Sequence, residues 1–387
     1  VVDEQRLKQA FSQWQSINQS FDWQKVAVLM ALTRQFCVIS GGPGTGKTTI
    51  VLKLLELFFN QSHDLRIALA APTGKAAARL QQAISAIEQQ TIEAKTVHRL
   101  LGITSNRPEG RYSVDRPLPV DVLIIDEASM IDITLMAKLI KALSKSTRLI
   151  LLGDSQQLAS VESGAILASL CEDKPSFSDR FSQQVTTFTG LELVNEFESS
   201  SFIDSVVQLQ HSYRFDEQSQ VGLLANVVKH GDDDSVIGYL ISHLDAAWQQ
   251  KVDQAMIIQQ VMALYQAFFE AIKANQTAGK CLELFEQSRV LCALKQGPES
   301  VETVNYLIER ALAKQAWRTH QGFYHGRPVM ITQNDYRQGL FNGDTGLILY
   351  DDKGRLAACF EDGDDLRWLA LNRLPGHETA YAMTAHK

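Results

Sequence analysis

The sequence predicts an α/β fold in which parallel strands are covered by helices on both faces. Three observations support this prediction. Short apolar runs that are typical of buried strands alternate with segments of helical periodicity. A glycine-rich loop, Gly41–Gly46, lies between an apolar run and a helical segment. Two adjacent carboxylates, Asp126 and Glu127, directly follow another apolar run.

The first half of the chain supplies most of this alternation. Apolar runs without polar alternation indicate strands buried on both faces, and four are expected at Phe36–Ser40, Arg66–Ala71, Val120–Ile125 and Arg148–Leu152. Helical spacing is found over residues 1–35, Thr48–Phe59, Ala76–Ala86 and Leu135–Leu143. We expect a loop or a small inserted hairpin at Thr104–Pro119 and a polar, mobile stretch at Glu172–Ser201.

The second half predicts another parallel-sheet unit with a small β-barrel-like insertion. A second strand–helix alternation begins near Val206 and reappears at Arg289–Leu294, with a helical stretch at Trp248–Phe285 between them. The pattern then changes to short strands at Pro328–Thr332, Gly346–Leu349, Leu356–Phe360 and Leu366–Leu371. Asp362-Gly363, between the last two strands, is typical of a hairpin turn.

Composition excludes several classes of protein. The 387 residues are 45% hydrophobic, yet no apolar stretch approaches the roughly 18 residues of a membrane-spanning helix, so no membrane is expected. No secretory signal is visible, and the five cysteines form no C-x-x-C pair, which disfavours a zinc site or a disulfide framework and favours a reducing cytoplasm. The net charge of −7 shows no overall basic footprint for nucleic acid, although a channel needs only local positive charge.

The glycine-rich loop carries the strongest chemical signal. Gly41–Thr48 fits the pattern G-x-x-x-x-G-K-[ST] and stands between a predicted strand and a predicted helix, which is the context that a phosphate-binding loop requires. Backbone N–H groups and the helix N-terminus would face a triphosphate, Lys47 would reach its β- and γ-phosphates, and Thr48 would hold Mg²⁺. The residues predicted to bind the nucleotide here are Gly41, Gly42, Pro43, Gly44, Thr45, Gly46, Lys47, Thr48 and Thr49.

Two further strand ends add catalytic candidates. Asp126 suits direct or indirect contact with Mg²⁺, and Glu127 suits a base that orients and deprotonates the attacking water. Gln157, which follows Gly153-Asp154 at the end of the next strand, is a candidate sensor of the γ-phosphate. Because ligands bind at the carboxyl ends of strands in open α/β sheets, we expect these side chains to share one edge. The acid pair favours nucleotide hydrolysis over simple binding.

Taken together, these motifs resemble superfamily 1 helicases, and further segments resemble the RecD-type branch, the alpha chains of exodeoxyribonuclease V. The similarity runs from about Asp22 to the last residue. The segments that carry it, besides the three motifs above, are Asp22–Gln24, Ala71–Leu80, Thr96–Gly102, Ser212–Phe215, Arg327–Asp335 with Phe341–Asp344, and Tyr381–Lys387.

The resemblance implies a fold and a mechanism. It implies a P-loop NTPase with two RecA-like parallel-sheet domains: residues 1–205, with a short insertion near 103–119, and residues 206–387, with an SH3-like β insertion near 323–374. It implies ATP and Mg²⁺ as cofactors, adenine recognition by Gln24, and a γ-phosphate contact from Arg214. ATP binding and hydrolysis would shift the two domains between closed and open states.

The resemblance also implies substrates and partners. The expected activity is 5′→3′ translocation on single-stranded DNA, as the motor subunit of a RecBCD-type complex in double-strand-break repair and recombination, with RecB- and RecC-like partners. DNA contacts are expected from side chains suited to phosphate contact or base stacking. They are Pro72, Thr73, Lys75, His98, Asn334, Thr384 and His386.

The ends of the chain lead to a further expectation. In the family, a Ser-Gln-Gly sequence and a later motif with a second arginine follow the position of Lys387, and an N-terminal docking domain precedes the motor. Because none of these is present in the 387 residues, we expect a motor core truncated at both ends and slower in hydrolysis than an extended form.

Two other classes of function stay open at this point. One is a P-loop ATPase switch or assembly ATPase that moves no strand, which would not need the segments Thr96–Gly102, Ser212–Phe215 and Thr384–Lys387. The other is a related stand-alone or conjugative superfamily 1 helicase. A nuclease site within this chain is disfavoured, since no spaced Asp…Glu-x-Lys cluster stands apart from the ATPase motifs, so a nuclease would lie on a partner.

Overall fold

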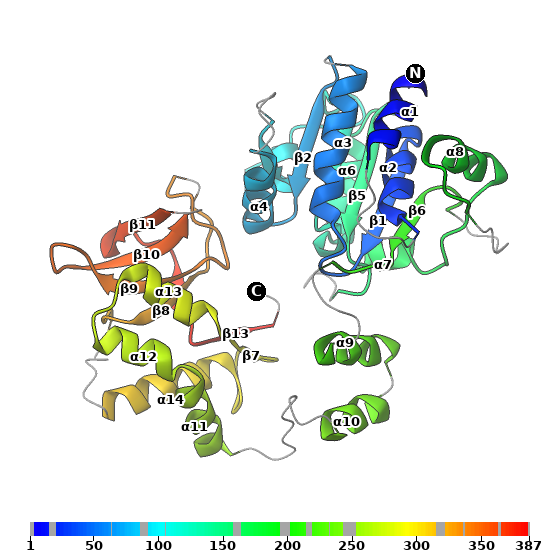
Figure 1. Ribbon diagram of the computed structural model, residues 1–387. Helices are drawn as coiled ribbons and strands as arrows, with labels where there is room; N and C mark the ends of the chain where they lie inside the picture. The colour runs from blue at the N-terminus through cyan, green and yellow to red at the C-terminus, as the bar shows by residue number, and fades with distance from the viewer. Residues whose placement is uncertain are drawn as a thin grey trace. The chain divides into compact units, whose positions relative to one another are not determined.

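The computed structural model describes most of the chain as two compact units, residues 1–247 and residues 248–387 (Figure 1). The described residues are 4–14, 21–62, 64–85, 92–104, 106–157, 164–193, 202–213, 219–231, 233–242, 253–314, 322–335, 337–362 and 365–385.

The first unit is built on a six-stranded sheet in the order β3-β2-β4-β5-β1-β6, and every neighbouring pair is parallel. The four strands predicted from apolar runs are all present, and the sequence missed only the short β3 and the edge strand β6 of this sheet. The strands are β1 (Phe36–Gly41), β2 (Ile67–Ala71), β3 (Ala94–Thr96), β4 (Val122–Ile125), β5 (Arg148–Gly153) and β6 (Val206–Leu209).

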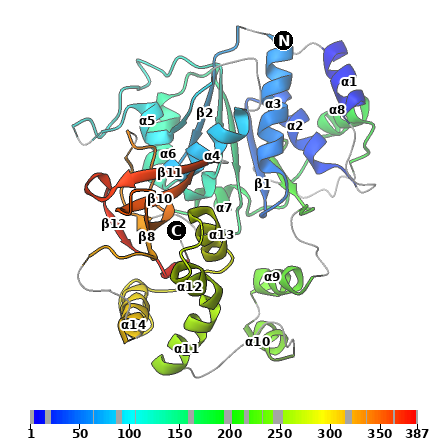
Figure 2. The ribbon, with the colours of Figure 1, turned by 60° about the vertical axis from the view of Figure 1, so that its left-hand side comes forward.

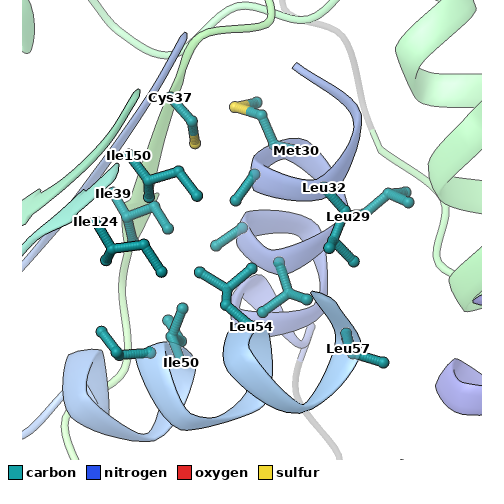
Figure 3. Close-up of a cluster of buried hydrophobic side chains, with 14 of the residues drawn as sticks. Leu29, Met30, Leu32, Cys37, Ile39, Ile50, Leu54, Leu57, Ile124 and Ile150 are labelled. Atoms are coloured by element: carbon teal, nitrogen blue, oxygen red, sulfur yellow. The ribbon is translucent and has the colours of Figure 1, made fainter. Parts of the chain in front are cut away.

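One face of this sheet is covered by α2, α3 and α4, while α8 packs on α2 and α1 packs on α8 and α3. Alternate strand side chains, such as Ile39, Ile124 and Ile150, lie in one buried apolar cluster with Met30 of α2 and Leu54 of α3 (Figure 3). Each such burial contributes about 1.5–3 kcal/mol relative to exposure. These helices are α1 (Glu4–Gln13), α2 (Trp23–Thr33), α3 (Lys47–Gln61), α4 (Gly74–Ile84) and α8 (Asp179–Thr189).

The other face is covered by shorter helices. Val38, Leu123 and Leu151 point to this side because successive strand side chains alternate. They pack against α5 (Val97–Leu101), α6 (Ile133–Ala142), α7 (Ile166–Leu170) and the 3₁₀ turn η1 (Ala128–Met130). Two layers of helices around a parallel sheet confirm the predicted α/β class.

The second unit joins a helical core to two small sheets. Its helices are α11 (Gln254–Leu264), α12 (Gln266–Lys273), α13 (Ala278–Glu286) and α14 (Val301–Lys314), and they bury Tyr265, Phe268 and Phe285. The strands β7 (Val290–Cys292) and β13 (Ala382–Thr384) form a parallel pair against this core. Within the described part of the chain, no single helix is long and apolar enough to span a membrane, and α11 with α12 reaches that length only as a pair bent by 59°.

An antiparallel sheet in the order β11-β10-β9-β8-β12 completes the second unit, and β8, β10 and β11 lie together in both views (Figures 1 and 2). It confirms the predicted β insertion. Gly346 permits the close pairing of β9 with β10, because a Cβ there would lie 2.5 Å from the Cys359 carbonyl oxygen. The elements are β8 (Arg327–Ile331), β9 (Thr345–Tyr350), β10 (Leu356–Asp362), β11 (Asp365–Ala370), η2 (Leu371–Arg373) and β12 (His377–Thr379).

Three sequence expectations differ from the structure or lie outside it. The stretch predicted to be mobile contains α8, which is held because Phe181 and Val185 are buried against the first core. The run near Val206, expected to open the second unit, is β6 of the first sheet, so the contact boundary falls after residue 247 rather than at the predicted 205. The turn residue Gly363 lies outside the described residues.

Two helices follow β6 in the chain and pack on each other: α9 (Gln220–His230) and α10 (Asp233–Ser242). Both belong to the first unit by contacts. The two RecA-like domains of the sequence analysis stay a prediction.

Candidate nucleotide site

The loop between β1 and α3 has the backbone of a phosphate-binding loop. Gly44 and Gly46 have φ values of 78° and 86°, a region that favours glycine. Gly46 is the N-cap of α3 and offers no side chain to cap it, so the first N–H groups of the helix are left for a ligand. Gly41 has no space for a side chain, because a Cβ would lie 2.6 Å from Thr45 Oγ1.

Lys47 is folded onto this loop. Its Nζ donates to the carbonyl oxygens of Gly41, at 2.6 Å, and Gly42, at 3.1 Å. These carbonyls are neutral acceptors, so the ammonium charge is available to an anion. Thr48 and Thr49 are exposed in the first turn of α3. The predicted phosphate ligands are therefore gathered at one helix start.

Gln24 braces the loop from the side. Asp22 caps α2 by accepting from the backbone N–H groups of Gln24 and Lys25. This cap places the Gln24 amide so that Nε2 donates to the Thr45 carbonyl oxygen at 2.9 Å. Gln24 is only 6% exposed, and a Cβ on Gly46 would lie 2.3 Å from its Nε2. The structure thus shows Gln24 supporting the loop, and its contact with adenine stays a prediction.

The acid pair lies at the end of β4. Glu127 has a left-handed backbone, with φ 53° and ψ 38°, and its N–H donates to Asp126 Oδ1 at 2.9 Å. Such strain in a residue other than glycine is concentrated at functional sites. Burial raises the pKa of Asp126, against the opposing effects of the Glu127 N–H and of Lys47. Burial, followed by the charge of Asp126, raises the pKa of Glu127, which makes Glu127 a stronger base than a free carboxylate.

The turn after β5 is tied to the strand that leads into the loop. Ser40 Oγ donates to Ser155 Oγ at 2.8 Å and accepts from the Ser155 N–H at 3.3 Å. Asp154 is buried, and its backbone oxygen accepts from the N–H of Gln157, whose side chain is exposed. Because β5 lies between β1 and β4, the loop, the acid pair and Gln157 share one edge, as the sequence predicted.

Two residues that the sequence analysis did not assign to the site also contact the loop. Ser212 Oγ donates to the Pro43 carbonyl oxygen at 2.9 Å, and the Tyr213 N–H donates to the Gly44 carbonyl oxygen at 2.8 Å. The signal that would have found them is the apolar run of β6, which carries the chain to the same edge. Arg214, the predicted γ-phosphate contact, lies outside the described residues.

The structure brings together four of the residues predicted to contact DNA. Pro72, Thr73 and Lys75 follow β2, His98 follows β3, and these strands are neighbours in the sheet. Thr73 is engaged as the cap of α4, accepting from the Ala76 N–H, while His98 is exposed.

The other predicted DNA contacts belong to the second unit. Asn334 is exposed, and its Oδ1 accepts from the Asn342 N–H. Thr384 is half-buried at the end of β13. His386 lies outside the described residues.

A magnesium ion fits the donors at this edge. No three His, Cys, Asp or Glu side chains among the described residues gather into a metal site of their own. Protein sites for Mg²⁺ typically offer one or two carboxylates and leave the other positions to water and phosphate oxygens. The Thr48 hydroxyl and the Asp126 carboxylate form such a set.

A parallel sheet with this loop after β1 and an acid pair after β4 defines a P-loop NTPase. A family model described as an AAA domain matches residues 24–163. The chain is 36% identical to the RecBCD enzyme subunit RecD of Haemophilus influenzae, over 99% of this chain and 64% of that protein. It is 37% identical to RecD of Mycolicibacterium smegmatis, over 95% and 63%.

More distant similarity extends to other helicases. The chain is 28% identical to the ATP-dependent RecD2 DNA helicase of Deinococcus radiodurans, over 90% of this chain and 41% of that protein. A solved structure of Pif1 helicases at forked DNA matches with a TM-score of 0.46 and 16% identity, over 95% of this chain and 83% of that one.

Over almost its whole length, the chain is similar in sequence to these RecD subunits. It spans 64% and 63% of the length of the two RecD subunits.

Proposed function

We propose that this protein binds ATP with Mg²⁺, hydrolyses it, and uses the reaction to move along single-stranded DNA. The observation that carries the proposal is the shared sheet edge. It holds Lys47 after β1, the pair Asp126–Glu127 after β4 and, after the next two strands, Lys75 (β2) and His98 (β3). A switch ATPase needs Lys47 and the acid pair for hydrolysis, but it has no use for the predicted DNA contacts Lys75 and His98.

The chain's own residues divide the work of hydrolysis. The loop N–H groups and Lys47 bind and orient the phosphates, while Thr48 and Asp126 would hold the ion, which neutralises charge on phosphate oxygens when bound. The Glu127 carboxylate accepts the proton of the attacking water, and its raised pKa suits that role. Gln157 senses the γ-phosphate. The hydrogen bond between Ser40 and Ser155 links the strand that leads into the loop to the turn that holds Gln157, so a movement of the loop is transmitted to that turn.

The contact of Ser212 and Tyr213 with the loop supports a role for Arg214. Because Ser212 and Tyr213 are hydrogen-bonded to Pro43 and Gly44, these two residues lie beside the phosphate site. We propose that Arg214 contacts the γ-phosphate there and that Gln24 reads adenine from the braced side of the loop.

The relatives support a place in a larger assembly. Two proteins similar over almost this whole chain are named subunits of the RecBCD enzyme. We propose that this chain acts with RecB- and RecC-like partners in the cytoplasm, in repair and recombination, that it moves 5′→3′, and that any nuclease site lies on a partner.

The test is ATP hydrolysis with and without a single-stranded oligonucleotide, at one fixed salt concentration because DNA affinity depends on salt. We expect strong stimulation by DNA. Lys75→Ala should raise the oligonucleotide concentration needed for half-maximal stimulation. Lys53→Ala is the matched control, since Lys53 lies on α3 in an ion pair with Glu56. Hydrolysis indifferent to DNA would overturn the motor proposal and favour a switch.

A further inference from the structure

The segment that connects the two sheets of the second unit is held by several buried and half-buried polar side chains. Only Ala380 and Tyr381 separate β12, the edge of the antiparallel sheet, from β13 of the parallel pair. Side chains from three distant parts of the chain bond to Thr379–Ala382. We call this segment the β12–β13 junction.

Asn305 on α14 makes the densest contact with the junction. Its Nδ2 donates to the carbonyl oxygens of Thr379 and Ala382, each at 3.0 Å, and its Oδ1 accepts from the Ala382 N–H at 2.8 Å. The residue is 7% exposed. Both amide hydrogens and the amide oxygen are therefore engaged with backbone 74 and 77 residues away.

Three tyrosines fix the middle of the junction. Tyr265 donates its hydroxyl to the Tyr381 carbonyl oxygen at 2.8 Å. The Tyr381 hydroxyl contacts the Gly326 carbonyl oxygen at 3.3 Å and the Tyr324 hydroxyl at 3.2 Å. Burial raises the pKa of all three phenols, so they stay neutral hydrogen-bond donors.

The start of the junction is bound to the antiparallel sheet and to α14 at once. The Arg327 guanidinium donates to Thr379 Oγ1 at 2.8 Å, and Thr379 Oγ1 donates to Glu309 at 3.2 Å. Glu309 is on α14, one turn beyond Asn305, and Arg327 opens β8. Helix, antiparallel sheet and β13 are thus joined through one short segment.

We propose that Asn305 is a positioning residue for DNA binding: it sets the backbone that presents Thr384 and keeps Thr384 in one rigid piece with the antiparallel sheet that carries Asn334. The inference rests on the proposed function, because it takes both residues as DNA contacts. Thr384 is two residues beyond the backbone groups that Asn305 holds. Without Asn305, the Ala382 N–H and the Thr379 oxygen lose buried partners, so β13 is free to shift against the sheet.

The experiment compares Asn305→Ala with Val304→Ala, its neighbour on α14. Val304 is 3% exposed in the same core but makes no polar contact with the junction in the described residues, so it controls for lost packing. Oligonucleotide affinity is measured by fluorescence anisotropy, DNA-stimulated hydrolysis by phosphate release, and folding by thermal unfolding.

We expect Asn305→Ala to weaken oligonucleotide binding about tenfold, the effect of losing one to two hydrogen bonds. The DNA concentration that half-saturates ATP hydrolysis should rise, while the maximal hydrolysis rate at saturating DNA should stay unchanged. Val304→Ala should lower the unfolding temperature without shifting DNA affinity. Asn305→Asp keeps the acceptor for the Ala382 N–H but places a buried carboxylate oxygen against the Thr379 and Ala382 carbonyl oxygens, so it should bind DNA no more tightly than Asn305→Ala.

Two results would overturn the inference, and they are distinguishable from failure of the proposed function. If the wild type binds DNA and Asn305→Ala behaves like Val304→Ala, Asn305 is merely structural. If the wild type neither binds DNA nor responds to it, the motor proposal fails and the inference falls with it. Should Asn305→Ala not fold, Tyr265→Phe, which removes the bond to the Tyr381 oxygen together with the hydroxyl's contacts with Arg289 and Val290, must show a smaller shift of the same sign.

Discussion

The phosphate-binding loop of the first unit, Gly41–Thr48, and the β12–β13 junction of the second unit are both rich in polar groups, but the loop's own groups are neighbours in sequence and those of the junction are not. At the nucleotide site, Lys47 bonds to carbonyls five and six residues away, and Thr48 stays exposed. At the junction, Tyr265 and Asn305 reach backbone 116 and 77 residues away, and the bonds are buried.

The difference shows whether the polar groups of a site stay available to a ligand or are satisfied by one another. Polar groups gathered by neighbours in sequence leave their charge to a ligand, so a substitution there should change chemistry more than stability. Polar groups gathered by the fold satisfy one another, so a substitution there leaves unpaired buried atoms and changes geometry and stability together. Variants of the loop in the first unit test this contrast, because they should change ATP turnover more than stability.

Lys47→Ala should give the largest effect on activity. It removes the charge directed at the phosphates, and the loss of one such preorganised contact typically lowers turnover about 10²–10³-fold. Stability should change by less than about 1.5 kcal/mol, the net contribution of an ordinary hydrogen bond. Phosphate release and denaturant unfolding check both parts, with Lys53→Ala as control. Near-normal turnover would defeat the assignment of the loop.

Gly46→Ala should combine a chemical and a structural effect. Its φ of 86° costs about 1–2 kcal/mol for a residue with a Cβ, and the new Cβ displaces the Gln24 amide that braces Thr45. Gly190→Ala is the matched control, because Gly190 has φ 74° and nothing lies within 4 Å of its Cβ position.

Both glycine variants should lose the stability that a positive φ costs, Gly46→Ala should lose more because its Cβ displaces the Gln24 amide, and only Gly46→Ala should lose ATP turnover. Calorimetric unfolding and steady-state hydrolysis measure the two quantities. If Gly46→Ala hydrolyses ATP like Gly190→Ala, the brace from Gln24 is irrelevant to the loop, and the contrast between the two kinds of site is weaker than we infer.

The same contrast explains how much the sequence could predict. The first sheet was readable because β1, β2, β4 and β5 are continuous apolar runs, and the loop Gly41–Thr48 was readable because its residues are contiguous. The β insertion was readable from short strands separated by turn residues. Each of these signals is local.

The features that the sequence missed depend on long-range pairing. β6 reads like the start of a new unit until it pairs with β1, and only this pairing places Ser212 and Tyr213 on the loop. Asn305 gave no signal at all, because a lone asparagine in a helical segment does not reveal which backbone it will meet.

The smallest loss of stability is expected at an exposed ion pair, and it gives the baseline against which the variants of both sites are compared. Arg66 donates to both carboxylate oxygens of Asp121, at 3.0 and 2.8 Å, and the side chains are 61% and 37% exposed. The Arg66 guanidinium, through its hydrogen bonds, holds the pKa of Asp121 below its usual range. Because solvent screens this pair, Asp121→Asn should lower stability by less than about 1 kcal/mol at pH 7.

The stability difference between wild type and Asp121→Asn should depend on pH. A carboxyl whose pKa is lower in the folded state stabilises the fold at pH values above its unfolded pKa of about 3.9. That stabilisation is lost as the pH falls through the folded pKa, so the difference between wild type and Asp121→Asn should shrink below about pH 4. Denaturant unfolding at pH 7 and pH 3, at low and high salt, measures it. A loss at pH 7 as large as that of Gly46→Ala would mean that exposure does not separate weak from strong polar contacts in this protein, and the contrast between the two sites would then need another cause.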